Sequence, residues 1–171
     1  MSFKVLVFCH HRKIVRPSDH FAYDFMMSYV PPGATVTFET VDKTGDPDYK
    51  IDAFSKTFAR DHLLEYDLLF MLDCGGEWFY TQQYDTKDSG QMYLNRINFR
   101  DRVLHVTSNM VKPGGSIVMS KFISLKFLQE MIRGFQIKNW NAILDENNDF
   151  FGDAVLTLQK PVLRMLVDGP G

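Results

Sequence analysis

Two short runs of consecutive apolar residues constrain the fold of this chain more than any other feature. Residues 5–9, VLVFC, and residues 68–72, LLFML, are continuously apolar and do not alternate between apolar and polar positions. A strand with this pattern is covered on both faces, which is typical of a parallel sheet with helices on either side. The two runs therefore predict buried strands inside an α/β domain.

The rest of the chain alternates between strand-like and helix-like patterns. Further strands are expected at residues 35–41, 117–119 and 155–158, and helices are expected around residues 18–30, 54–65, 97–111 and 127–132. Residues 141–151 fit either an edge strand or a loop. The alternation predicts one doubly wound α/β domain over residues 1–171, with a tail at 161–171. Its mostly parallel sheet is expected to have five to seven strands and helices on both faces.

Composition limits the classes of partner. The 171 residues are 45% hydrophobic, which is enough for a single packed core. The formal net charge of −2 gives no overall attraction to nucleic acid or to an anionic membrane, so neither is an expected partner. Two cysteines fit thiols in a reducing compartment, which predicts a cytoplasmic protein.

The C-terminal half resembles class I methyltransferases that use S-adenosylmethionine. Residues 110–115, MVKPGG, are similar to the turn that precedes the fifth strand in that family, and residues 156–161, LTLQKP, are similar to the end of its final hairpin. The resemblance implies a Rossmann-like methyltransferase fold with S-adenosylmethionine as the cofactor. The strand at 5–9 followed by YDLLFMLD also resembles small uncharacterised methyltransferase-like proteins of large DNA viruses.

The N-terminal half departs from the pattern of that family. Its first strand ordinarily ends in an acidic residue and a glycine-rich turn, whereas here the turn reads Cys9-His10-His11-Arg12, with no glycine before Gly33. Asp42, after the second strand, matches the acidic residue that holds the ribose hydroxyls in the family. The altered turn predicts a degenerate domain that serves as a binding or structural subunit with a protein partner or assembly. An active S-adenosylmethionine-dependent methyltransferase of unknown acceptor is the alternative.

The resemblance implies that the strands at residues 5–9 and 68–72 are neighbours, so their carboxyl ends are expected to meet at one edge of the sheet, where open α/β sheets bind ligands. Asp73 is the candidate catalytic residue, because the family places a residue that contacts the acceptor there. The candidate cofactor-binding residues are Cys9, His10, His11, Asp42, Asp73, Cys74 and Gly75.

The cysteines and histidines of this edge have two further interpretations. Zinc takes ligands of these residue types, but the chain has no C-x-x-C or H-x-x-x-H pair, so no metal site is predicted. Small core cysteines and histidines with local hydrogen bonds are the ordinary explanation.

Three cations close to these histidines form the most basic cluster of the chain. Arg12, Lys13 and Arg16 predict an anion-binding site, although a solvated surface loop explains them equally well. The spacing differs from that of low-molecular-weight tyrosine phosphatases, because the arginine comes one place too late after Cys9. Residues 77–80, EWFY, fit an aromatic wall over a substrate or ordinary packing. Arg96, Arg100 and Arg102 indicate a solvated helix face.

Overall fold

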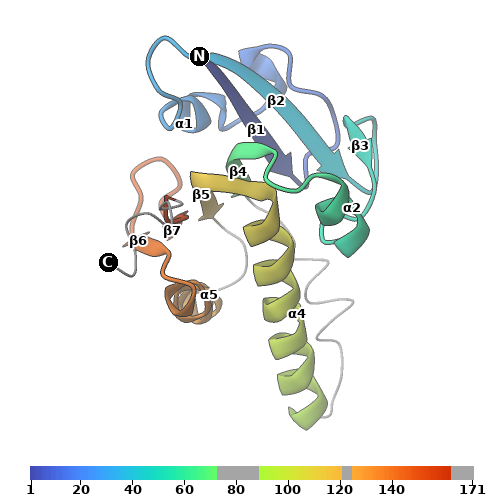
Figure 1. The fold of residues 1–171 in the computed structure, drawn as a ribbon, viewed down its shortest axis with the longest axis vertical. Helices are drawn as coiled ribbons and strands as arrows, with labels where there is room; N and C mark the ends of the chain where they lie inside the picture. The colour runs from blue at the N-terminus through green and yellow to red at the C-terminus, as the bar shows by residue number, and fades with distance from the viewer. Residues whose placement is uncertain (73–88, 121–124, 163–171) are drawn as a thin grey trace, which may run out of the picture.

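The computed structural model describes residues 1–72, 89–120 and 125–162. They form a mixed, mostly parallel seven-stranded sheet in the order β3-β2-β1-β4-β5-β7-β6, with β7 antiparallel to both of its neighbours (Figure 1). This confirms an α/β architecture. The strands are β1 (Ser2–Phe8), β2 (Thr35–Asp42), β3 (Tyr49–Lys50), β4 (Tyr66–Leu72), β5 (Val111–Ser120), β6 (Asn141–Asp145) and β7 (Val155–Gln159).

The two apolar runs form the centre of the sheet. β1 pairs in parallel with β2 on one side and with β4 on the other. Val5, Leu6 and Val7 are completely buried because both faces of the strand are covered. Leu6 belongs to the core on one face, and Val5 and Val7 belong to the core on the other. The continuous apolar pattern therefore predicted these strands correctly.

Helices cover both faces unequally. The face that carries Leu6 is covered by α2 (Lys56–Asp61), α4 (Ser89–Met110) and α5 (Leu125–Ile137). The opposite face is covered by the short α1 (Tyr23–Met27), whose Met26 packs with Val5 and Val7. Within the described residues, no helix combines the length and apolar character that crossing a membrane requires.

The third strand is much shorter than the others. The loop of residues 43–48 joins β2 to β3, which pairs in parallel with the last two residues of β2. Parallel neighbours ordinarily need a connection of a dozen or more residues, usually containing a helix. So short a loop accounts for the two-residue length of β3 and for the absence of a helix between β2 and β3.

The first helix is shorter than the spacing of Phe21, Phe25 and Tyr29 predicts. A 3-10 turn, η1 (Pro17–Asp19), is followed by an extended His20 and only then by α1. The Asp19 carboxylate does not cap α1, because it accepts main-chain N–H groups from residues 15 and 16, which precede it. Phe25 and Tyr29 pack on one face of the sheet instead, and the Phe25 ring lies 4.8 Å from that of Phe151, which follows β6.

The junction between α4 and β5 also differs from the expectation. The helix ends at Met110, so Val111 is the first residue of β5 and not part of the helix. Gly115 lies so close to β4 that a Cβ atom there would come within 2.7 Å of the Asp67 carbonyl oxygen. The second glycine of the Pro-Gly-Gly turn is therefore needed for strand packing.

A network of ionisable side chains ties β1, β2, β3 and β4 together. Glu39 accepts hydrogen bonds from the hydroxyls of Tyr66 at 2.8 Å and Tyr49 at 3.0 Å. Lys4 lies 2.8 Å from Glu65 and 3.4 Å from Glu39. Burial, followed by the bond to Glu39, raises the pKa of Tyr49 to about 12, and the same causes raise the pKa of Tyr66. We call these five residues the Glu39 network.

Candidate functional site

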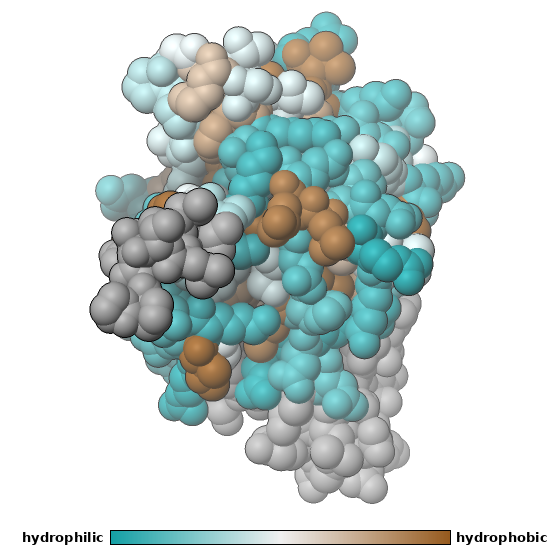
Figure 2. Space-filling model, viewed as in Figure 1, coloured by the Kyte–Doolittle hydropathy of each residue, from teal (hydrophilic) through white to brown (hydrophobic). Residues whose placement is uncertain are grey.

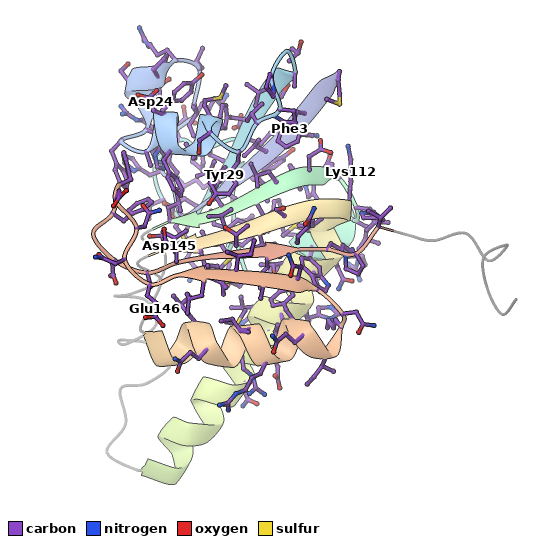
Figure 3. All side chains as sticks on the ribbon, turned by 90° about the vertical axis from the view of Figure 1, so that its left-hand side faces the viewer. Phe3, Asp24, Tyr29, Lys112, Asp145 and Glu146 are labelled. Carbon is purple, nitrogen blue, oxygen red and sulfur yellow. The ribbon has the colours of Figure 1, made fainter. Side chains whose placement is uncertain are left out.

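The carboxyl ends of β1 and β2 lie side by side. Phe8 pairs with Val41, and the Cys9 N–H donates to the Val41 carbonyl at 2.8 Å, so Cys9 and Asp42 leave the sheet at the same edge. Asp145 and Glu146 mark this edge at the far side of the sheet, whereas Phe3 and Lys112 lie toward the opposite ends of the strands (Figure 3). Candidate residues Asp73, Cys74 and Gly75, together with residues 77–80, lie outside the described residues.

Cys9 is disulfide-bonded in the structure, which contradicts the expectation of two thiols. The second cysteine of the chain, Cys74, lies outside the described residues. Cys9 also has a left-handed backbone, with φ of 61°, which is uncommon for a residue with a side chain. The first strand therefore ends in a sharp turn at a residue that is held by a disulfide. We call residues 9–20 the β1 loop.

His10 is used to fold the β1 loop. Its Nε2 lies 2.8 Å from the Asp19 carbonyl oxygen, and its ring lies 4.5 Å from that of His20 and 5.6 Å from that of His11. Burial is the main cause that lowers the pKa of His10, and the nearby positive groups add to it. The hydrogen bond to the Asp19 carbonyl and, to a smaller extent, the Asp42 carboxylate raise this pKa and oppose the effect of burial.

His20 was not identified from the sequence, yet it is the most buried histidine of the loop. Its side chain is 6% exposed, its Nδ1 accepts the Ala22 N–H at 2.9 Å, and its ring stacks on Phe21 at 5.0 Å. Burial, with the charges of His10 and Arg12, lowers its pKa to about 4. The available signal was the position of His20 between Asp19 and a series of spaced aromatic residues. It was missed because that series was interpreted as one helix.

The three cations of the predicted anion site have different roles. Arg12 donates from Nε to the Asp19 carbonyl at 3.1 Å and from a terminal nitrogen to the Ser18 carbonyl at 3.2 Å, so several of its donors hold the loop. Arg16 lies 3.9 Å from the Asp19 carboxylate. Lys13 and Arg16 are exposed, and anion binding by this cluster stays a prediction.

The β1 loop is fastened to the loop of residues 43–48. The Asp46 N–H donates to the His11 carbonyl at 2.7 Å, and Arg12 and Asp46 form an isolated parallel bridge. Gly45, with φ of 76°, approaches so closely that a Cβ atom there would lie 2.2 Å from the His11 oxygen. Main-chain contact therefore joins the loops that follow β1 and β2. Asp42 is partly exposed beside them, and its Oδ1 accepts a 3.4 Å hydrogen bond from the Thr44 N–H.

Three cavities that the described residues line lie away from this edge. Cavities of about 630 and 360 Å³ adjoin between α2 and α4. A third, of about 290 Å³, lies near Phe3 and Tyr29 beside the start of β5 (Figure 3). Concave surface is therefore found between the helices and at the amino ends of the strands.

Comparisons with known proteins add little to this geometry. No family model matches the chain, and no curated protein matches its sequence. A solved structure described as a possible exported protein from Bordetella parapertussis is similar to it, with a TM-score of 0.47 and 9% identity. The match covers 92% of this chain and 62% of that chain, so this chain spans less than two thirds of that protein. No activity, partner or location follows from a similarity of this degree.

Proposed function

We propose that the chain is a degenerate methyltransferase-like domain that has lost the cofactor pocket and acts as a binding or structural subunit. The observation that carries this proposal is the fastening of the β1 loop to the loop of residues 43–48, where Gly45 and Asp46 contact the His11 carbonyl directly. A nucleotide-like cofactor needs open space and bare backbone after the first strand. The direct main-chain contact between the two loops supports the loss of that space.

Two further features support a methyltransferase-like ancestry. The order β3-β2-β1-β4-β5, with α1 on one face and α2, α4 and α5 on the other, agrees with a doubly wound sheet that reverses direction beside β1. The antiparallel β6–β7 hairpin beside β5 agrees with the final hairpin that the resemblance of residues 156–161 implies.

An active S-adenosylmethionine-dependent methyltransferase is the second candidate, and Asp42 is the residue that favours it. Its carboxylate leaves the sheet at the carboxyl edge and is partly exposed. The hydrogen bond that it accepts from the Thr44 N–H is long, at 3.4 Å, so its oxygens can still accept hydrogen bonds from the hydroxyls of a ribose. In this alternative, Asp73 would contact the methyl acceptor.

Calorimetric titration with S-adenosylmethionine and S-adenosylhomocysteine separates the two candidates. For the degenerate domain we expect no binding at millimolar concentrations of either ligand. Micromolar binding that is lost in Asp42→Ala and retained in Asp149→Ala, a matched change of an exposed carboxylate in the β6–β7 loop, would overturn the proposal and establish a working cofactor site.

A further inference from the structure

A groove between α2 and α4 lies apart from the carboxyl edge and has no part in the function proposed above. Its two cavities, of about 630 and 360 Å³, adjoin, because Lys56 and His105 line both of them. Figure 2 views the molecule from the side of these helices, and hydrophilic residues cover most of the surface there that is not grey. The polar groups that line the groove include Lys56, Arg60, Asn98, Arg102, His105 and Asn109.

Helical spacing explains why these side chains gather. Residues 98, 102, 105 and 109 repeat at intervals of three or four along α4, so they share one face, and Lys56 and Arg60 are separated by one turn of α2. The other side of α4 packs on the sheet through Val103, Val106 and Met110. From residue 98 to residue 109 the polar stripe extends about 16 Å along the helix axis.

The groove carries an excess of positive charge. Neither Lys56 nor Arg60 pairs with a carboxylate in the part of the chain that the structure describes. Arg102 is held in place, because its Nε donates to the Phe54 carbonyl at 2.8 Å and a terminal nitrogen lies 3.9 Å from Asp52. The carboxylate in the lining, Asp101, lies 3.0 Å from Arg100 outside the groove. The groove is therefore locally cationic, although the net charge of the chain is −2.

We propose that this groove binds the sugar-phosphate backbone of a single-stranded nucleic acid without regard to sequence. Arginine, lysine and asparagine side chains are those that ordinarily contact phosphate oxygens. A groove that binds a protein partner is expected to offer apolar surface to aromatic or aliphatic anchor side chains. Here Ala59 and Leu63 are the apolar side chains among the described lining residues, which favours a charged partner. Among the described lining residues no phenylalanine, tyrosine or tryptophan offers a base a large stacking surface, and His105 is the one ring there, so the contacts favour the backbone.

The net charge of −2 gives no overall attraction to nucleic acid, so the proposal rests on a local patch. α2 and α4 are distant in the sequence, and only the fold brings Lys56 and Arg60 to the groove that Arg102 lines. The proposal does not depend on whether the carboxyl edge binds a cofactor. A negative calorimetric titration with S-adenosylmethionine leaves it unaffected.

Fluorescence anisotropy with labelled oligouridine and oligothymidine of about 16 nucleotides tests the proposal. We expect the two strands to bind with similar affinity at low salt. If Lys56, Arg60 and Arg102 each neutralise one phosphate, affinity should fall about 20-fold between about 50 and about 200 mM salt. Lys56→Glu/Arg60→Glu should weaken binding at least about tenfold and flatten the salt dependence.

The matched control is Arg133→Glu/Lys138→Glu, which makes the same change of charge at two exposed positions on and after α5. We expect this control to bind as the original chain does. An equal loss in both variants, the absence of binding at low salt, or equally tight binding of poly-glutamate would overturn the proposal. Lys56→Gln/Arg60→Gln, with its fold checked by circular dichroism, replaces the charge-reversed pair if that variant does not fold.

Discussion

Two clusters of ionisable side chains lie on the same sheet and are stabilised in opposite ways. In the β1 loop, His10 and Arg12 bond to main-chain carbonyls, and His20 accepts a main-chain N–H. In the Glu39 network, carboxylates accept from tyrosine hydroxyls and from Lys4. The loop thus depends on histidines that stay neutral, whereas the network depends on carboxylates that stay charged.

This difference teaches how an unusual turn is accommodated in a common architecture. The residues that look most functional in the sequence, the histidines and cations after β1, are largely engaged in holding the loop. The network uses residues that no motif singles out, and it joins four strands. Unusual side chains at a strand end can therefore hold a loop in place through hydrogen bonds to its main chain.

The largest effect expected in the β1 loop is that of its disulfide. Reduction should lower the free energy of unfolding by about 3 kcal/mol, because the bond restricts the unfolded chain. Urea denaturation with and without dithiothreitol measures the change, and Cys9→Ser should be insensitive to the reductant. Two thiols that react with Ellman's reagent in the oxidised, folded protein would contradict the assignment.

The next largest effect concerns the neutral state of His20. The unfolded chain takes up a proton near pH 6.5, while the folded chain does so only near pH 4, so stability is lost as the pH falls through this window. Between about pH 7.5 and about pH 4.5 the loss from this group should be on the order of 2 kcal/mol.

His20→Asn is the matched variant, because an asparagine oxygen can accept the Ala22 N–H but does not titrate. Urea denaturation at both pH values should show a smaller loss in this variant than in the original chain. An identical pH dependence in the two proteins would mean that His20 does not cause the loss of stability at low pH. The β1 loop would then not differ from the Glu39 network in this respect.

A third prediction concerns the central carboxylate of the network. Glu39→Ala should cost about 2 kcal/mol, because it leaves the hydroxyl of the fully buried Tyr66 without this acceptor. Tyr49→Phe removes a more exposed hydroxyl from the same carboxylate and should cost less. Urea denaturation at neutral pH measures both losses. A greater loss of unfolding free energy in Tyr49→Phe than in Glu39→Ala would mean that the hydroxyl of Tyr49, and not that of Tyr66, matters most in the network.

The smallest effect is expected for Glu65. Burial opposes its ionisation, but hydrogen bonds from Lys4 and His62 prevail and lower its pKa below the ordinary 4.5. Its contribution is therefore complete above pH 4.5 and is lost as the pH falls through the lower folded pKa. Glu65→Gln should cost about 0.5 kcal/mol at neutral pH and low salt, and less at high salt. A cost that persists at pH 2 would contradict this origin.

The central strands could be predicted because their pattern is local. Val5 to Val7 and Leu68 to Leu72 are apolar at every position, and burial on both faces leaves no other simple explanation. The helix expected after β1 was predicted too long, because the periodic aromatic residues gave no sign that Asp19 would cap the preceding turn and His20 would stay extended. Tertiary contacts decided that segment.

The position of the candidate residues follows from the pairing of the strands. The sequence predicted a mostly parallel sheet, and the parallel pairing of β1 with β2 places Cys9 and Asp42 at one edge. It did not indicate that Cys9 is disulfide-bonded or that Asp46 donates to His11, because both depend on contacts between distant segments. The cationic groove escaped notice for the same reason, since its two halves lie on different helices.

The central position of β1 has a consequence for how the protein is made. This strand precedes all the others in the chain, yet Val5 pairs with Phe38 on one side and with Leu68 on the other. During translation its apolar side chains stay uncovered until β4 has left the ribosome, and that interval exposes them to chaperones or to aggregation. The strand of this sheet that comes earliest in the chain is thus enclosed late, and its deletion would remove the middle of the sheet and not an edge.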